Sequence, residues 1–157
     1  MDNYVYVMQV RYGSTFELIK DVDNSLLGIG VPSMILQPLV ENAILHGFNE
    51  LSKPGVIVVS AAIQDGTLVI TISDNGNGMS AEILANVFSD DKAAHTKGGG
   101  LSRIGLHNVR RRIILSYGTD YGMEVASYPG EGTAVTLKLP LQKPERHESR
   151  CDDRNPA

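Results

Sequence analysis

The feature that most restricts the fold of this chain is a pair of strand-like segments separated by a two-residue turn. Residues 55–64 and 67–73 are rich in Val, Ile and Thr, and Asp65-Gly66 joins them. An Asp-Gly dipeptide between two such runs is a strong signal for a β-hairpin. The sequence therefore predicts an antiparallel pair near the middle of the chain. Further strand-like segments are residues 16–22, compatible with an edge strand, and residues 123–128 and 133–139 on either side of a Pro-Gly-Glu-Gly turn.

Two longer segments carry the helical repeat of apolar residues. Between residues 31 and 47, apolar side chains recur every three or four positions and form one stripe. Pro38 either opens this helix or kinks it, because proline has no N–H to donate. Residues 104–117 repeat the pattern, and Ser80 can cap a short helix over residues 81–88. Helices set against one mixed, mostly antiparallel sheet make an α/β (α+β) two-layer sandwich.

Composition excludes several classes of protein. The 157 residues suit a single domain, which we expect over residues 13–140. A formal net charge of −4 argues against a nucleic-acid surface, and a single cysteine excludes an internal disulfide or a multi-cysteine metal site. No apolar run approaches the ~18 residues of a membrane span. Residues 4–11 are ambiguous between strand and helix, and residues 141–157 lack an apolar period, which predicts a disordered tail.

Two motifs carry polar residues suited to binding a ligand. ENAILHG, residues 41–47, sets Asn42 and His46 four positions apart on one helix face, and an Asn oxygen suits Mg²⁺. The alternative is that Glu41 and Asn42 face solvent and that His46 is a C-terminal helix residue favoured by the helix dipole. In DNGNGM, residues 74–79, alternate glycines allow close approach to a flat ligand, and the carboxylate of Asp74 can accept a hydrogen bond from an exocyclic amine. The alternative is a turn whose aspartate caps its own backbone.

Two further glycine motifs are weak signals when taken alone. GGGLSRIGL, residues 98–106, predicts a flexible loop that runs into a helix N-terminus, where free N–H groups can bind phosphate. Lys97 and Arg103 add positive charge there, although a plain linker explains the glycines equally well. GEGT, residues 130–133, is most often only a hairpin turn.

The order and spacing of the four motifs resemble the GHKL superfamily of ATP-binding domains. Within that superfamily, the segments VPSMILQPLVENAILHG and RIGLHNVRRRIILSYG resemble the catalytic domain of YesM/LytS-type sensor histidine kinases. The resemblance covers residues 4–140, nearly all of the chain that is expected to be ordered. It implies a Bergerat-type ATP-binding fold with ATP and Mg²⁺ as its ligands.

The resemblance also implies roles for the motif residues. Asn42 would coordinate a Mg²⁺ ion that bridges the ATP phosphates, with Glu41 supporting the water shell of the metal and His46 reaching the phosphates. Asp74 would accept from the adenine amine and so select against guanine, which has a carbonyl there. The remaining implied contacts are Gly76, Gly78, Met79 and Thr133 around the adenine, residues 89–100 as the ATP lid, and Gly100, Leu101, Arg103, Gly105 and Leu106 on the phosphate side.

Three positions depart from the pattern of related proteins. Leu45 replaces a lysine that many relatives direct at the phosphates. Arg103 stands where many have glycine, and it either makes bidentate phosphate contacts or points to solvent. Pro38 occupies the position of the water-activating glutamate in the gyrase and heat-shock-chaperone branches. Because proline cannot accept a proton, the resemblance implies slow hydrolysis and transfer of the γ-phosphoryl group to a protein acceptor.

The resemblance implies partners beyond this sequence. The family carries its phosphate-accepting histidine in a two-helix dimerisation domain, and residues 1–12 resemble the last turns of that domain. None of the four histidines, His46, His95, His107 and His147, lies in such a hairpin. We therefore expect a catalytic fragment that binds Mg–ATP and phosphorylates little by itself. The full protein would be a homodimeric, membrane-anchored bacterial kinase with this domain in the cytoplasm, and it would act on a response regulator. We expect no nucleic-acid or membrane contact by this segment.

Two other functions fit the same motifs. A stand-alone GHKL serine kinase of the anti-sigma-factor type suits the short length, although QPLVEN, residues 37–42, favours the histidine kinase. The other is a nucleotide-gated binding module without transfer activity.

Overall fold

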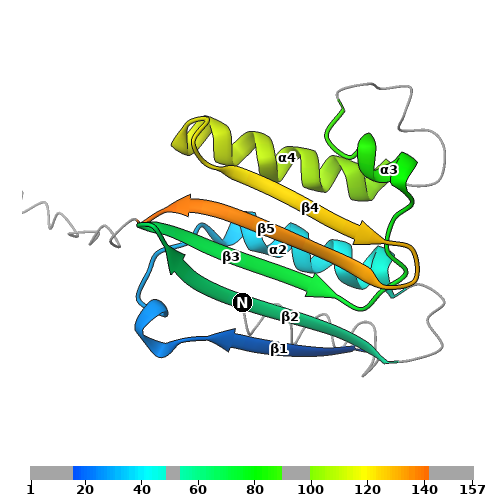
Figure 1. Ribbon diagram of the computed structural model, residues 1–157, viewed down its shortest axis with the longest axis horizontal. Helices are drawn as coiled ribbons and strands as arrows, with labels where there is room; N and C mark the ends of the chain where they lie inside the picture. The colour runs from blue at the N-terminus through cyan, green and yellow to red at the C-terminus, as the bar shows by residue number, and fades with distance from the viewer. Residues whose placement is uncertain (1–15, 49–53, 90–99, 142–157) are drawn as a thin grey trace, which may run out of the picture.

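The computed structural model describes residues 16–48, 54–89 and 100–141 (Figure 1). The predictions for residues 1–12, for the body of the lid and for the tail beyond Leu141 lie outside these residues.

Five strands form one sheet in the order β1-β2-β3-β5-β4 (Figure 1). β1 pairs with β2 in parallel and the other neighbours are antiparallel, as the sequence predicts for a mixed, mostly antiparallel sheet. The predicted edge strand and both hairpins are confirmed, with strand ends that differ by one residue at most. The strands are β1 (Phe16–Val22), β2 (Gly55–Gln64), β3 (Thr67–Asp74), β4 (Gly122–Tyr128) and β5 (Gly132–Pro140).

The first long helix differs from the prediction in its interior and at its end. α2 (Ser33–Asn42) contains Pro38, so the alternative in which proline opens the helix is wrong. The chain then continues as a π-helical turn, η2 (Ala43–Gly47), where a regular helix was expected. Such wider turns occur mostly as single turns and often at functional sites.

The other helices also shift at their ends. α3 (Ala81–Ala85) is three residues shorter than predicted, because the Asn86 side chain donates to the carbonyl of Glu82 at 2.9 Å and Asn86 leaves the helical conformation. Its N-cap is confirmed, since the Ser80 hydroxyl accepts from the Ile83 amide. α4 (Gly100–Tyr117) begins four residues before the predicted start, so the last glycine of the loop belongs to its first turn. A short 3₁₀ turn, η1 (Asn24–Leu26), follows β1.

The helices cover one face of the sheet and leave the other open. Buried strand residues alternate, as in Ile57 and Val59 of β2 and Ile70 and Ile72 of β3, and they share one core with residues of α2 and α4. Figure 1 shows α2 running behind the sheet, with α4 next to β4. The predicted two-layer sandwich is therefore confirmed. Within the described ranges, no helix has both the length and the apolar character that crossing a lipid bilayer requires.

Candidate functional site

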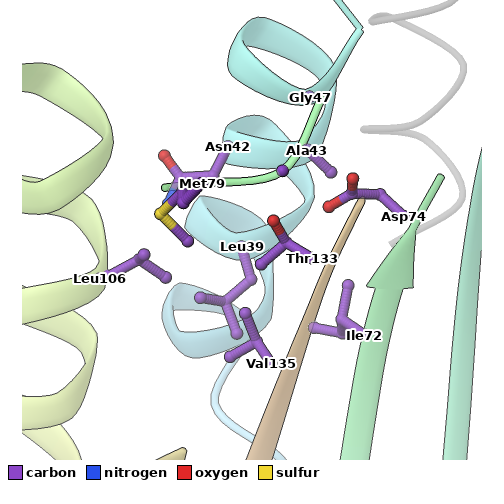
Figure 2. A pocket seen from close by; sticks show the side chains of 11 residues that line it. Leu39, Asn42, Ala43, Gly47, Ile72, Asp74, Met79, Leu106, Thr133 and Val135 are labelled. Carbon is purple, nitrogen blue, oxygen red and sulfur yellow. The ribbon is translucent and has the colours of Figure 1, made fainter. Parts of the chain in front are cut away.

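A small cavity lies where the ends of β3 and β5 meet α2 and α4 (Figure 2). Its volume is about 50 Å³, which is room for a few water molecules. Figure 2 shows Asp74 on one side of the cavity, Asn42 on the other and Thr133 between them. The residues that line it are Leu39, Asn42, Ala43, Gly47, Ile72, Asp74, Gly78, Met79, Leu106, Thr133 and Val135.

Asp74 is held in place by backbone amides at the end of β3. Its Oδ1 accepts from the Gly76 amide at 2.8 Å, and the amide of Thr133 is a second donor. Burial raises the pKa of the Asp74 carboxyl, and these two backbone hydrogen bonds oppose the rise. The carboxylate is therefore oriented and partly desolvated at the edge of the cavity.

The π-helical turn brings the end of the first helix against the glycine motif. The amide of Asn77 donates to the carbonyl of Gly47 at 2.8 Å. A Cβ on Gly76 would overlap the backbone of Gly47, and one on Gly47 would lie 3.1 Å from Asp74 Oδ1. Gly76 itself does not line the cavity; its missing side chain lets the two backbones meet beside Asp74.

The closing hairpin packs on the same motif from the other side. Gly130 donates to the carbonyl of Asn77 at 2.8 Å. Gly78 has φ +64° and a Cβ there would overlap the Tyr128 carbonyl, while Gly132 has φ +111° and a Cβ there would overlap the Asp74 carbonyl. Both positions require glycine for two reasons: the positive φ is unfavourable for other residues, and there is no space for a side chain.

Asn42 comes from α2 and faces α4 across a narrow gap. A Cβ on Gly105 of α4 would lie 3.2 Å from Asn42 Nδ2. Gly105 therefore lets the two helices approach at this point, and the next residue, Leu106, contributes a buried wall of the cavity. Met79, half-buried, covers the side of the cavity next to Asn42 in Figure 2.

The remaining predicted residues are not placed in the cavity by the described part of the chain. Glu41 does not line the cavity, and its carboxylate accepts from Gln37 Nε2 at 3.3 Å. Gly100 forms the first residue of α4. The backbones of His46, Leu101 and Arg103 are helical, but their side chains lie outside the described residues.

Sequence reasoning missed two groups of residues. The apolar walls, such as Leu39 and Val135, follow the same periodicity as the core, so no sequence signal separates them from it. Ser127 of β4 is the other omission: it is 6% exposed, and it is the one polar side chain buried among the residues that the structure describes. A lone serine within a strand carries no motif.

The sequence matches a known family over most of its length. Residues 32–143 match the family described as histidine kinase-, DNA gyrase B-, and HSP90-like ATPase. Over 140 residues the chain is 32% identical to the sensor histidine kinase YesM of Bacillus subtilis, which covers 89% of this chain and 22% of YesM. Over 148 residues it is 31% identical to the sensor protein LytS of Staphylococcus saprophyticus, which covers 94% of this chain and 24% of LytS. The chain therefore spans about a quarter of the length of these relatives.

Solved structures share the fold. The full-length structure of ShkA in complex with AMPPNP superposes with a TM-score of 0.63 at 18% identity, over 90% of this chain and 29% of ShkA. This likeness confirms the predicted architecture, and the sequence matches confirm the predicted family. The chain belongs to the histidine kinase-, DNA gyrase B- and HSP90-like ATPase family, and over most of its length it is similar to part of YesM and LytS.

Proposed function

We propose that this domain binds Mg–ATP in the cavity between Asp74 and Asn42 and donates the γ-phosphoryl group to a histidine in a separate dimerisation domain. The observation that carries the proposal is that a strand-end carboxylate and a helix amide, 32 residues apart in sequence, line one cavity. ShkA, a structural relative, was solved with AMPPNP, an analogue of ATP. The family match makes the same class of ligand the natural occupant here.

At the base end, the Asp74 carboxylate would accept a hydrogen bond from the adenine amine. Guanine has a carbonyl at that position, and two acceptors facing each other repel. Met79 would pack against the ring. The Met79 side chain is unbranched and flexible, so it can adjust to the ring.

At the phosphate end, the residues fit Mg²⁺ rather than a metal held by protein alone. Within the described part of the chain, no group of three or more His, Cys, Asp or Glu side chains could hold a metal ion. Mg²⁺ usually keeps several waters and shares its coordination between one or two protein ligands and the phosphates of the substrate. The Asn42 amide oxygen would be such a ligand. When bound, the ion would neutralise phosphate charge. Pro38, four residues before Asn42, cannot activate water, so we expect little hydrolysis.

Nucleotide titration tests the pocket. Calorimetry with Mg–ATP, Mg–ADP and Mg–GTP on the full chain should give binding of both adenine nucleotides and a much weaker response to GTP. Equal affinity for all three would remove Asp74 from base recognition, and no binding at all would remove the nucleotide site.

Phosphotransfer distinguishes the three candidate functions. The chain is incubated with γ-labelled ATP and a full-length kinase that carries the dimerisation domain but an inactivated ATP site. Label that is lost in acid indicates phosphohistidine and supports the proposal. Acid-stable label indicates a serine kinase, and ATP binding without any labelled product indicates a non-transferring module.

Substitution of Asn42 tests the metal. Asn42→Ala should abolish the Mg²⁺ dependence of ATP binding, because the ion loses its protein ligand while the base contacts remain. Calorimetry with and without Mg²⁺ measures the difference. Asn24→Ala, an exposed amide in η1, is the matched control. An unchanged Mg²⁺ dependence in Asn42→Ala would point to another ligand.

We further infer the setting of the whole protein from its sensor relatives. The full chain would be a homodimer anchored in a bacterial membrane, with this domain in the cytoplasm where ATP is available, and it would pass the phosphoryl group on to a response regulator. Fractionation of cells that express the full-length protein tests the membrane anchor.

A further inference from the structure

Ser127 connects two elements that flank the proposed base site. The register of the sheet aligns Ser127 of β4 with Thr133 of β5, and Thr133 in turn with Asp74 of β3. All three side chains lie on the helix-covered face, in one row across three strands. Ser127 Oγ accepts from the Met79 amide at 2.8 Å, donates to the Gly132 carbonyl at 2.9 Å and lies 2.9 Å from Thr133 Oγ1.

Only one assignment of the hydroxyl protons makes all three contacts hydrogen bonds at once. A serine hydroxyl has one proton and two acceptor positions. The Gly132 carbonyl can only accept, so the Ser127 proton is used there. The Met79 N–H occupies one acceptor position of Ser127. The other is left for the proton of Thr133, and Thr133 Oγ1 then has only lone pairs for any further partner.

We propose that Ser127 is a positioning residue for base recognition: it anchors the Met79 backbone and turns the Thr133 hydroxyl into an acceptor beside the Asp74 carboxylate. This inference rests on the proposed function, in which a purine lies next to these residues. Two neighbouring acceptors favour an amine, directly or through a water molecule, and disfavour a carbonyl. Preference for adenine would then depend on a serine that does not line the cavity.

Removal of the hydroxyl tests the proposal on the full chain. In Ser127→Ala the Met79 amide loses its acceptor and the Thr133 proton is released. Because Met79 is then no longer anchored and the Thr133 hydroxyl can turn its proton toward the base, we expect the affinity for Mg–ATP to fall about 5- to 100-fold. Mg–ITP, which carries a carbonyl in place of the amine, should lose less, so the ratio of ATP to ITP affinity should narrow. Ser127→Cys keeps most of the volume with a much weaker hydrogen-bonding group, and it should behave like Ser127→Ala.

A double-mutant cycle separates positioning from general stability. In a Thr133→Val background, Ser127→Ala should change the ATP-to-ITP ratio no further, because the hydroxyl on which it acts is absent. Thr136→Val removes a hydroxyl from the same strand on the open face, and it should leave the ratio unchanged. A wild-type ratio in Ser127→Ala would overturn the proposal, even if both affinities fall together.

One measurement does not depend on nucleotide. Hydrogen exchange of the Met79 amide should be faster in Ser127→Ala than in Thr136→Val in the absence of ligand. If the wild-type chain fails to bind ATP, the proposed function fails, and this exchange rate alone then decides whether Ser127 anchors Met79. An unchanged rate would overturn the positioning role.

Discussion

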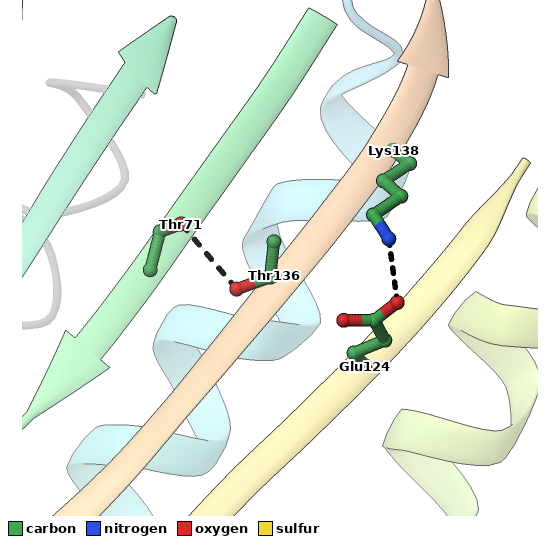
Figure 3. A network of polar contacts seen from close by, with 4 residues as sticks. All are labelled: Thr71, Glu124, Thr136 and Lys138. Carbon is green, nitrogen blue, oxygen red and sulfur yellow. Dashed lines mark hydrogen bonds and ion pairs between the residues drawn. The ribbon is translucent and has the colours of Figure 1, made fainter. Parts of the chain in front are cut away.

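Two rows of polar side chains cross the same three strands, on opposite faces of the sheet. One row, the covered row, consists of Asp74, Thr133 and Ser127. The other, the open row, consists of Thr71, Thr136 and Glu124, three residues away along each strand. Figure 3 shows the open row, in which Thr71 and Thr136 lie 3.4 Å apart and Glu124 binds Lys138 at 2.6 Å.

The two rows contain similar chemical groups but differ in their surroundings. The Glu124 and Lys138 side chains are 69% and 48% exposed, whereas Ser127 is 6% exposed. Water competes with the Glu124–Lys138 ion pair of the open row, so that contact contributes little. In the covered row Ser127 is buried, so water cannot readily replace a partner that its hydroxyl loses. The position of the helices, rather than the type of residue, therefore separates a recognition site from an ordinary sheet surface.

The largest effect on stability should come from Gly132, which packs against the Asp74 carbonyl in the covered row. Gly132→Ala should reduce the free energy of unfolding by about 2–4 kcal/mol, because a strained positive φ and an overlap with the Asp74 carbonyl both oppose it. Gly130→Ala is the matched control, since it has φ +78° but open space around it, and it should cost about 1 kcal/mol. Urea unfolding measures both. Equal losses would mean that Gly132 is not packed tightly against the Asp74 carbonyl.

The carboxylates of the two rows should differ in their effect on ligand binding. Asp74→Asn should weaken ATP binding by about 1–3 kcal/mol, since it removes a charged acceptor from a partly buried site. Glu124→Gln on the open face makes the same chemical change and should leave the affinity unaltered. Calorimetry compares the two variants, and a wild-type affinity in Asp74→Asn would break the distinction between the rows.

Acid should weaken ATP binding through Asp74. Burial raises the pKa of this carboxyl, and a proton there prevents it from accepting from the adenine amine. The affinity should therefore be highest above the raised pKa and fall by at most about tenfold per pH unit below it. In the nucleotide-free chain the sign is opposite: Asp74 contributes stability below its unfolded-state pKa, and this contribution is lost as the pH rises through the folded-state pKa. Calorimetry over a pH series should show the loss of affinity in the wild type and not in Asp74→Asn.

The elements that local chemistry determines were predictable from the sequence. The hairpin follows from Asp65 and Gly66, which adopt the positive φ angles of 49° and 76° that such a turn needs. Asp74 was predictable because its motif combines a carboxylate with alternate glycines directly after a strand. Both signals are contained in a few adjacent residues.

The parts that were not predictable depend on contacts between distant segments. The π-helical turn that ends at Gly47 lies against Gly76. Nothing in the sequence around either residue indicates this contact. Leu39 and Val135 line the cavity with the same apolar side chains that fill the core. Ser127 is buried because the register between β4 and β5 sets it beside Thr133, and a pattern within one strand does not reveal that register.

The smallest effect should come from the ion pair of the open face. Lys138→Gln removes the cation that binds Glu124, and we expect a loss of less than about 0.5 kcal/mol in the free energy of unfolding, because both side chains are well exposed. The loss should shrink further as the salt concentration rises, since mobile ions screen exposed charges. Urea unfolding at low and high salt measures this change. A loss of about 1–3 kcal/mol, which is the cost of leaving a buried polar group without its partner, would contradict the view that exposure makes this ion pair weak.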